Sequence, residues 1–371
     1  MAELPCAYLD EFSEPSGYMN FASLGPVSRR SAEAVAHLAA RLPGAGAEIA
    51  DLASGALDAA REATARLYSV PGEQAGLVSS TSEALFHVAF GLKGGNVVVP
   101  AGEFAANVYP WLRAHEAGLV DEVRRVPLRD GRIDPGDVAA AVDRRTRVVA
   151  ASLVSFATGF RVDPGGLREA AGDALLVLDV IQAAGAVPVT LGDADLVVAD
   201  ARKWLRAGFG IAGLAASPTL LDRVEPTLTG WTGVEDFLDF TVPEPHPSRR
   251  DAGRFAMGGA WSLAAASYHA ALEVIELAGI DAISAVVLER SRRVEEVLRV
   301  VGATVRAPWR DETERAGIVT FQMGGEDAPS TVARLADAGF TVSDRAGWVR
   351  VAVHATTDLE AIDELGRVLR R

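Results

Sequence analysis

Short apolar runs recur through the first two thirds of the chain and predict strands that are buried on both faces. The runs lie at residues 96–101, 147–155, 174–181, 195–200 and 210–217. Each run is nearly continuous rather than alternating, which is typical of a parallel sheet covered by helices on both sides. A covering helix is predicted just before the first run, at Ser82–Leu92, because its apolar residues share one face. The pattern therefore predicts a doubly wound α/β domain.

The last third of the chain has a different pattern. Residues 242–250 contain three prolines and no periodicity, which predicts a connection between domains. Beyond them the pattern predicts a helix, two strands and a final helix, at 262–277, 317–323, 348–353 and 356–369. Thr357 and Glu360 have the spacing of a capping box at the start of that final helix. We therefore expect three parts, an N-terminal arm at 1–18, a large domain at 19–245 and a smaller C-terminal α+β domain at 246–371.

Lysine is rare in this chain, which makes each lysine informative. Only two of the 36 Lys and Arg residues are lysines, Lys93 and Lys203. Arginine can replace lysine wherever positive charge is enough, but it cannot form a Schiff base. Lys93 lies in the polar, glycine-flanked segment GLKGGN and is expected to be solvated. Lys203 follows an apolar run in VVADARKWLRAGFGIAG, where desolvation favours a neutral, nucleophilic amine. A structural lysine whose stem packs on apolar surface fits the same pattern.

Four other features stand at predicted element ends. Asp179 ends an apolar run at the edge where parallel sheets bind ligands, although a turn aspartate fits as well. Thr81 and Ser82 begin a predicted helix, so they form either an anion site or a plain helix cap. Phe104 offers an aromatic plate or a core side chain. Arg350 lies on a predicted inner strand and needs an anionic partner, either a carboxylate of the protein or one of a substrate.

In this order, these residues resemble those of the class V, fold-type I pyridoxal-phosphate (PLP) enzymes. The most specific segment is LDVIQAAGAVPV…DLVVADARKWLRAGFGIAG, where Asp-x-x-Gln and Lys-Trp-Leu are separated by a family-like interval. The similarity extends from YMNFASLGPVS to the final helix and points to the isopenicillin-N-epimerase-like and C–S lyase-like branch. It implies a fold-type I α/β architecture, in which a mostly parallel seven-stranded sheet lies between helices and a smaller C-terminal α+β domain follows.

The resemblance also implies roles for particular residues. Lys203 would hold PLP as a Schiff base and shuttle the α-proton, and Asp179 would pair with the ring nitrogen. Further cofactor contacts are implied for Gln182, Thr81, Ser82, Phe104 and Gly259. Substrate contacts are implied for Arg350, Asn20 and Ser23. His354, four residues after Arg350, is either a substrate contact or a polar residue on the approach to the final helix, and Trp231 is a further candidate wall of the site, from its own or a partner subunit.

Three positions depart from the commonest family pattern. Phe156 stands where desulfurases carry Asn, and Gly259 stands where relatives carry a Thr that reaches the neighbouring subunit's phosphate. Asp200 replaces a Ser that often contacts phosphate. Because a carboxylate repels phosphate unless Arg202 or a backbone amide intervenes, we leave Asp200 outside the phosphate site.

The cysteine content bears on the reaction. Cys6 is the only cysteine, whereas a desulfurase mechanism needs a thiolate in the C-terminal half to accept sulfur. We therefore expect a PLP enzyme that is not a cysteine desulfurase. C–S (β-elimination) lyase and aminotransferase activities are nearly equal expectations, with an epimerase or a decarboxylating enzyme as alternatives. A catalytically silent ligand-binding protein is the non-enzyme alternative; a nucleotide-binding protein is disfavoured, because the segment lacks a GxGxxG or GKS/T loop.

The composition limits the classes of partner that the protein is expected to bind. The net charge of −14 argues against nucleic acid and anionic membrane surfaces. No apolar stretch approaches the length of about 18 residues needed to span a bilayer. The single cysteine argues against a disulfide and a Cys-based metal site, and the acidic start differs from a secretory signal. We expect a cytoplasmic protein that binds no metal and acts on a small amino-acid-like substrate. The resemblance adds a homodimer with sites at the subunit interface.

Overall fold

Two sheets organise the chain in the computed structural model, which describes residues 4–241, 245–258 and 261–370. The large sheet contains β1 (Ala75–Val78), β2 (Asn96–Pro100), β3 (Glu122–Val126), β4 (Thr146–Ser152), β5 (Leu175–Asp179), β6 (Leu196–Asp200) and β7 (Ala212–Ala216). The small sheet contains β8 (Thr304–Arg306), β9 (Ile318–Gln322), β10 (Ser343–Arg345) and β11 (Trp348–Ala352).

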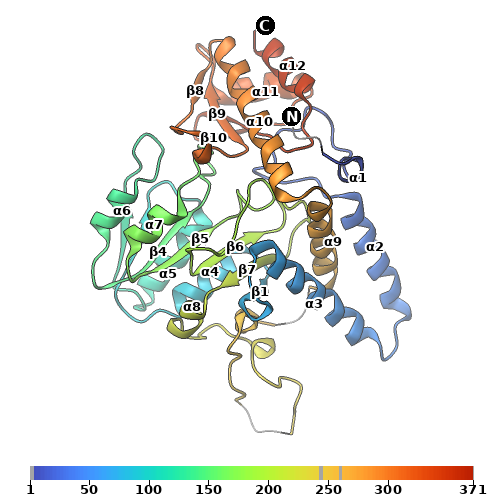
Figure 1. The fold of residues 1–371 in the computed structure, drawn as a ribbon, viewed down its shortest axis with the longest axis vertical. Coiled ribbons are helices and arrows are strands. Elements are labelled where there is room, and N and C mark those ends of the chain that lie inside the picture. The colour runs from blue at the N-terminus through green and yellow to red at the C-terminus, as the bar shows by residue number, and fades with distance from the viewer. Residues whose placement is uncertain (1–3, 242–244, 259–260, 371) are drawn as a thin grey trace.

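Helices pack against both sheets (Figure 1). The helices in the earlier part of the chain are α1 (Cys6–Leu9), α2 (Arg29–Arg41), α3 (Ile49–Tyr68), α4 (Thr81–Phe90), α5 (Tyr109–Glu116), α6 (Pro135–Ala141), α7 (Pro164–Ala171) and α8 (Pro218–Arg223). The later helices are α9 (Ser262–Ala278), α10 (Ile280–Val300), α11 (Ala328–Asp337) and α12 (Leu359–Leu369). Among the helices of the described residues, none combines the length and the apolarity needed to cross a bilayer.

The large sheet confirms the predicted architecture. Its order is β1-β7-β6-β5-β4-β2-β3, and β3, β2, β4, β5 and β6 run parallel. Strand β7 is antiparallel to both of its neighbours. Consecutive residues of β5 explain the apolar runs. Leu175 and Val177 pack with α4, α5 and α8, whereas Leu176 and Leu178 pack with α3, α6, α7 and α9. Continuous apolarity therefore reports burial on both faces and does not fix the strand direction, as β7 demonstrates.

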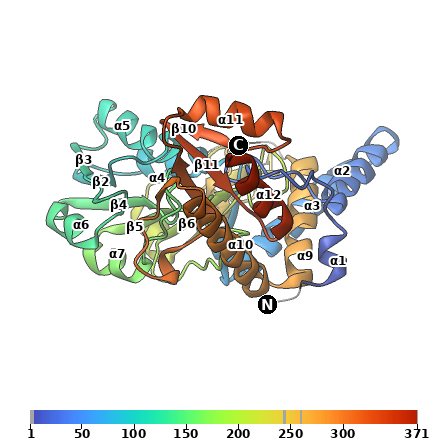
Figure 2. The ribbon, with the colours of Figure 1, turned by 90° about the horizontal axis from the view of Figure 1, so that it is seen from above.

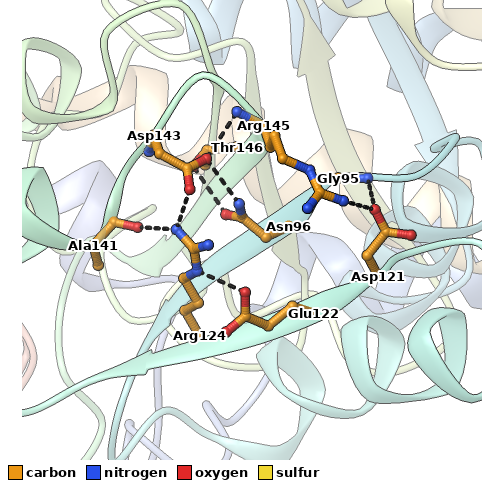
Figure 3. A network of polar contacts seen from close by, with 9 residues as sticks. All are labelled: Gly95, Asn96, Asp121, Glu122, Arg124, Ala141, Asp143, Arg145 and Thr146. Carbon is orange, nitrogen blue, oxygen red and sulfur yellow. Dashed lines mark hydrogen bonds and ion pairs between the residues drawn. The ribbon is translucent and has the colours of Figure 1, made fainter.

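The amino ends of three parallel strands are tied together by a polar network (Figure 3). Arg124 on β3 donates to Glu122 and to Asp143, at 2.9 Å in each case. Asn96 at the start of β2 donates to Asp143 at 3.1 Å and accepts from the hydroxyl of Thr146, at the start of β4, at 2.9 Å. These contacts hold the amino ends of the three strands together. The polar residues described below lie at the opposite, carboxyl edge of the sheet.

The C-terminal segment forms the antiparallel sheet β10-β11-β9-β8, which packs with α10, α11 and α12 around a third apolar cluster. The predicted capping box of α12 is wrong, because the hydroxyl of Thr357 accepts from the backbone N–H of His354 at 3.0 Å and Asp358 is the N-cap. Helix α9 packs against α2 and α3, and α1 lies beside it (Figure 2). The expected domain limits at 18/19 and 245/246 stay predictions. Part of the expected connection, 242–244, lies outside the described residues.

The close approach of Gly25 to the turn after β6 gives a test of the packing. Its backbone N–H donates to the carbonyl of Arg202 at 2.8 Å, and a Cβ on Gly25 would lie 2.0 Å from the carbonyl oxygen of Lys203. We predict that Gly25→Ala lowers the free energy of unfolding by about 1–3 kcal/mol, because this contact must be forced apart. Gly55 in α3 is the matched control, since a Cβ added there would have nothing within 4 Å. Gly55→Ala should raise stability by about 0.5–1 kcal/mol. Denaturant unfolding measures both, and a Gly25→Ala protein as stable as the parent would contradict the predicted packing.

Candidate active site

A cavity lies at the carboxyl edge of the large sheet, where β4, β5 and β6 end and α4 begins. Its lining consists of Ser80, Thr81, Ser82, Phe104, Ala106, Ser152, Phe156, Asp179, Ile181, Gln182, Asp200, Arg202 and Lys203. Six of the residues selected from the sequence therefore meet in one place: Thr81, Ser82, Phe104, Asp179, Gln182 and Lys203. Segments more than a hundred residues apart in the chain converge here because parallel strands end at a common edge.

A larger, more open hollow lies elsewhere, between residues 234–239 and 249–251. Its lining is rich in Asp and Glu, and its Arg249 is already paired with Asp251 at 2.7 Å. It contains no lysine, cysteine or histidine that could act as a nucleophile or a base. Size therefore does not identify the reactive site, and the chemistry of the smaller cavity does.

Lys203 is held in the turn after β6, with its amine facing the cavity. The residue is 6% exposed, and Nζ lies 5.7 Å from the centroid of the Phe104 ring. Burial lowers the pKa of the amine to about 7, against the opposing attraction of Asp179. Lys93 differs from Lys203 in burial and in its partner, because it is exposed and pairs with Glu225 at 3.0 Å. The prediction that Lys93 is a solvated charge is confirmed, and Lys203 is the desolvated amine.

Asp179 ends β5 as a buried carboxyl group. Its Oδ1 accepts from the backbone N–H of Ile181 at 2.9 Å, and no ion pair holds it within the described residues. Burial raises its pKa to about 6, although Lys203 and Arg202 pull in the other direction. A carboxylate of this kind can accept a hydrogen bond from a protonated ring nitrogen, and its charge is then compensated.

Gln182 follows at the edge of the same cavity. Its Nε2 donates to the carbonyl of Ala22, and its Oε1 accepts from the indole N–H of Trp204, both at 2.9 Å. The side chain thus ties the N-terminal segment to the turn that carries Lys203. One N–H of its amide is left for a ligand.

The start of α4 and the end of β6 form an anion-sized corner. Ser80, which the sequence pattern did not single out, is the N-cap and accepts from the backbone N–H of Glu83 at 3.2 Å. The hydroxyl of Thr81 accepts from the backbone N–H of Asp200 at 3.0 Å. Arg202 pairs with Asp200 through its guanidinium group and its backbone N–H. The guanidinium group of Arg202 therefore offsets the negative charge of Asp200, which would otherwise repel a phosphate. With that charge offset, this corner can hold phosphate.

Arg350 on β11 is a buried guanidinium without a carboxylate. It is 1% exposed; Nη1 donates to the carbonyl of Phe156 at 2.9 Å and Nη2 to the hydroxyl of Ser23 at 2.7 Å. Arg345 donates to the same hydroxyl at 2.9 Å, and Ser23 in turn donates to Asn20 at 2.8 Å. Nε of Arg350 has no partner, and burial together with the charge of Arg345 lowers its pKa to about 9. The anionic partner expected from the sequence is absent from the described residues, so an external carboxylate fits here.

Other residues selected from the sequence are not part of the cavity lining. His354 lies in the core, stacked on Phe21 at 4.9 Å, and burial holds its pKa well below the usual value. Neither His354 nor Arg350, Asn20 and Ser23 line the cavity, so the substrate contacts expected of these four residues stay predictions. Trp231 is 56% exposed and packs on Phe237, away from the cavity of its own subunit, so its contribution through a partner stays a prediction. Gly259 lies outside the described residues.

The residues present fit PLP. The cavity is lined by an amine whose pKa is lowered to about 7, a buried carboxyl group, an aromatic ring, a hydroxyl-rich helix start and a guanidinium group. Within the residues described, no group of three or more His, Cys, Asp or Glu side chains could hold a metal ion.

Comparisons with known proteins agree with this site. A family model for aminotransferase class-V matches residues 27–360. A probable cysteine desulfurase of Methanothermobacter thermautotrophicus is 29% identical over 84% of this chain and 82% of its own. The solved structure of a cysteine desulfurase from Thermococcus onnurineus NA1 superposes with a TM-score of 0.85 at 22% identity, covering 95% of this chain and 93% of that chain. A complex of the cystine C–S lyase C-DES with its product cysteine persulfide has a TM-score of 0.87 at 18% identity, covering 95% and 97%. The family match confirms the resemblance and, with it, PLP as the expected cofactor.

These comparisons correct one expectation. The exclusion of cysteine desulfurases is wrong, because the curated relatives and the similar solved structures include proteins of that name. The exclusion treated the place of a thiol in the sequence as its place in the fold. Cys6 is exposed on α1, so a thiol is accessible from solution, and sequence position alone does not rule out sulfur transfer.

The contrast between the two lysines gives a direct test. We predict that Lys203→Arg abolishes covalent attachment of PLP and that Lys93→Arg leaves it unchanged. In the apo-protein the attachment rate should rise with pH and be half-maximal near pH 7, because the neutral amine reacts and burial lowers its pKa to about 7. Stopped-flow absorbance measures the rate. A midpoint near the ordinary lysine value of about 10.4, or attachment in Lys203→Arg, would contradict the assignment.

Proposed function

Because the chain belongs to the aminotransferase class-V family, we propose that it is a PLP-dependent enzyme that cleaves the C–S bond of cysteine or an S-substituted cysteine. The observation that carries the proposal is the meeting of Lys203 and Asp179 in one cavity. Arg350, which has no carboxylate partner within the described residues, contacts Phe156 in the wall of that cavity. The sulfur comes from the relatives, whose names refer to cysteine desulfurase and to cystine C–S lyase. Transamination, which the family name suggests, is the competing outcome.

Several residues would hold the cofactor. Ser80, Thr81 and Ser82 at the start of α4, together with Arg202, would bind its phosphate. Phe104 would stack on the ring, and Gln182 would donate to a ring substituent. PLP supplies an electron sink for the bonds broken at the α-carbon of an amino acid.

Lys203 and Asp179 would manage the protons. With its pKa near 7, Nζ of Lys203 is largely neutral above neutral pH and can accept a proton from the α-carbon of a bound amino acid. Asp179, whose pKa is about 6, is largely ionised at pH 7 and can hold a proton on the ring nitrogen. The two pKa values move in opposite directions for the same reason, since burial disfavours the charged form of each group.

The cluster of Arg350, Arg345 and Ser23 would bind the substrate carboxylate. A guanidinium group presents two parallel N–H donors to a carboxylate, which fixes the orientation of the α-carbon. Two arginines that share one hydroxyl create more positive charge than one carboxylate needs. The cluster therefore suits a substrate with a second anionic group, such as cystine, which carries two carboxylates.

The balanced reaction needs no further redox partner. An S-substituted cysteine and water give a thiol, pyruvate and ammonium when the C–S bond breaks after loss of the α-proton. The Phe104 and Phe156 rings, 5.3 Å apart and edge to face, would keep water from the reacting atoms until the sulfur has left. Nothing in this scheme asks for a metal ion.

A homodimer is part of the proposal. Residues 231–241 carry exposed apolar side chains beside the region of the expected inter-domain connection, including Trp231, Leu238 and Phe240, the last 87% exposed. Exposed apolar side chains clustered in this way are typical of an interaction surface. A second copy of the chain would cover them and could bring Trp231 to the partner's cavity.

Arg350 links stability and substrate binding. We predict that Arg350→Met leaves the melting temperature of the apo-protein unchanged or raises it, because it removes a buried charge that no carboxylate neutralises. The KM for the amino-acid substrate should rise about 100-fold, since truncating one partner of a buried charge pair costs roughly 2–5 kcal/mol. Arg334→Met is the matched control, because Arg334 pairs with Glu326. This substitution should lower stability without changing KM. A loss of stability larger than the two hydrogen bonds to Phe156 and Ser23 explain would reveal an internal anionic partner and contradict the assignment.

The products identify the reaction. We predict that the PLP-loaded protein converts L-cystine or an S-substituted cysteine into pyruvate and ammonium in equal amounts, measured by coupled assay and mass spectrometry. Release of alanine would mean that sulfur passes to a thiol, and Cys6→Ser would then test whether the single cysteine of the chain accepts it. A sulfur-containing keto acid, with the amino group retained on the cofactor, would indicate transamination and contradict C–S cleavage.

A further inference from the structure

Glu103 is a carboxylate beside the cavity to which the proposed function gives no role. It lies between β2 and the short 3-10 turn Ala105–Asn107, one residue before Phe104. Its carboxylate accepts from the backbone N–H of Ser152 at 2.7 Å and from the hydroxyl of the same residue. Ser152 ends β4 directly opposite Asp179, the last residue of β5. Glu103 therefore reaches from the loop after β2 to the strand next to the reactive carboxyl group.

The backbone of β2 cannot make this contact itself. Pairing between β2 and β4 ends at Val98 and Val149, and beyond this point the β2 chain follows β3, with Ala101 N–H donating to Val126 at 2.6 Å. Gly102 then turns the chain at a φ of 81°. The N–H of Ser152 would lose its acceptor, and the Glu103 carboxylate replaces the missing carbonyl. Leaving a buried N–H without an acceptor is costly, so the loop is anchored at this point.

The anchor sets the direction of the next side chain. Phe104 has an extended backbone conformation, with φ −64° and ψ 149°. Because Glu103 and Phe104 are adjacent, fixing Glu103 on β4 also restricts the direction of the Phe104 side chain, whose ring centroid lies 5.7 Å from Nζ of Lys203. Phe104 is 43% exposed and its ring meets the edge of Phe156, so this restriction helps to hold a ring that is only partly packed.

Keeping Glu103 ionised at this buried position costs free energy. No ion pair holds Glu103 within the part of the chain that the structure describes, and the charged group that faces it is Asp179 on β5. Its pKa is raised to about 7, mainly by burial and also by the charge of Asp179, against the hydrogen bonds of Ser152 on β4 and Asn107 in the turn, which lower it. A glutamine has the same shape and would avoid this cost.

We propose that Glu103 is a positioning residue, whose hydrogen bonds to Ser152 hold the loop after β2 so that Phe104 presents its ring to the cofactor. The inference rests on the proposed function, because it takes the cavity as the PLP site. Glu103 itself acts through Phe104 and touches neither cofactor nor substrate.

The affinity of the apo-protein for PLP tests this role independently of turnover. We predict that Glu103→Ala weakens PLP binding about tenfold, because the loop and the ring lose their anchor. Glu103→Gln should stay within about twofold of the parent, since its amide oxygen can accept from the Ser152 N–H and its amide nitrogen can donate to the Ser152 hydroxyl. In a Phe104→Leu background, Glu103→Ala should change the affinity less than about twofold, because the ring it positions is gone. If Glu103→Ala does not fold, Glu103→Asp, which is one methylene too short to reach Ser152, replaces it.

The outcomes separate the explanations. Equal losses in Glu103→Ala and Glu103→Gln would show that charge rather than the anchor matters, and additive losses with Phe104→Leu would show that Glu103 does not act through the ring. Either result would overturn the inference. A parent apo-protein that does not bind PLP would instead overturn the proposed function.

Thermal unfolding adds a second readout. The folded state binds a proton at Glu103 more tightly than the unfolded chain, because the pKa of this carboxyl group rises from 4.5 to about 7 on folding. The contribution of Glu103 to stability is therefore fully present below pH 4.5 and falls as pH rises towards 7. The stability advantage of Glu103→Gln should grow across that range, and an advantage that does not change with pH would contradict the burial of this carboxylate.

Discussion

The site depends on the burial of charged groups that the protein does not neutralise. Desolvation lowers the pKa of Lys203 to about 7 and that of Arg350 to about 9, and it raises that of Asp179 to about 6. A pKa that moves by one corresponds to about 1.4 kcal/mol between the two protonation states, so the apo-protein holds these groups at a cost. An aldehyde for the amine, a protonated ring nitrogen for the carboxylate and a substrate carboxylate for the guanidinium would relieve all three. The cavity is thus complementary to a loaded PLP site rather than to water.

The sheet makes this concentration of groups possible. Its amino edge is tied by a network in which carboxylate and guanidinium groups are paired (Figure 3), whereas its carboxyl edge carries the buried groups of Lys203 and Asp179, which no ion pair holds within the described residues. Parallel strands bring the ends of β4, β5 and β6 together, and the helix start at Thr81 faces them. Arg350 on β11 of the small sheet does not line the cavity, but it donates to the carbonyl of Phe156, which does, and to Ser23 in the N-terminal segment. The small sheet and the N-terminal segment are thereby connected to a residue of the cavity wall.

Local pattern predicted the parts of the site that stand at element ends. Lys203, Asp179 and Thr81 follow or begin apolar runs, so the sequence could place them on one edge of a parallel sheet. Strand β3 was not predicted, because it is an edge strand whose sequence EVRRV is mostly polar and partly exposed. Helix α3 was missed as well. Glu103 and Arg345 carry no local signal, because their roles come from hydrogen bonds to Ser152 and Ser23, residues distant in sequence.

The site of covalent attachment distinguishes a reactive lysine from a structural one most clearly. Borohydride reduction of the PLP-loaded protein, followed by proteolysis and peptide mass spectrometry, locates the lysine that carries the cofactor. We expect a pyridoxyl mass on the peptide that contains Lys203 and none on the peptide that contains Lys93. A label on Lys93, or bound PLP that leaves both lysines unmodified, would show that a desolvated amine at the carboxyl edge of the sheet does not define the function.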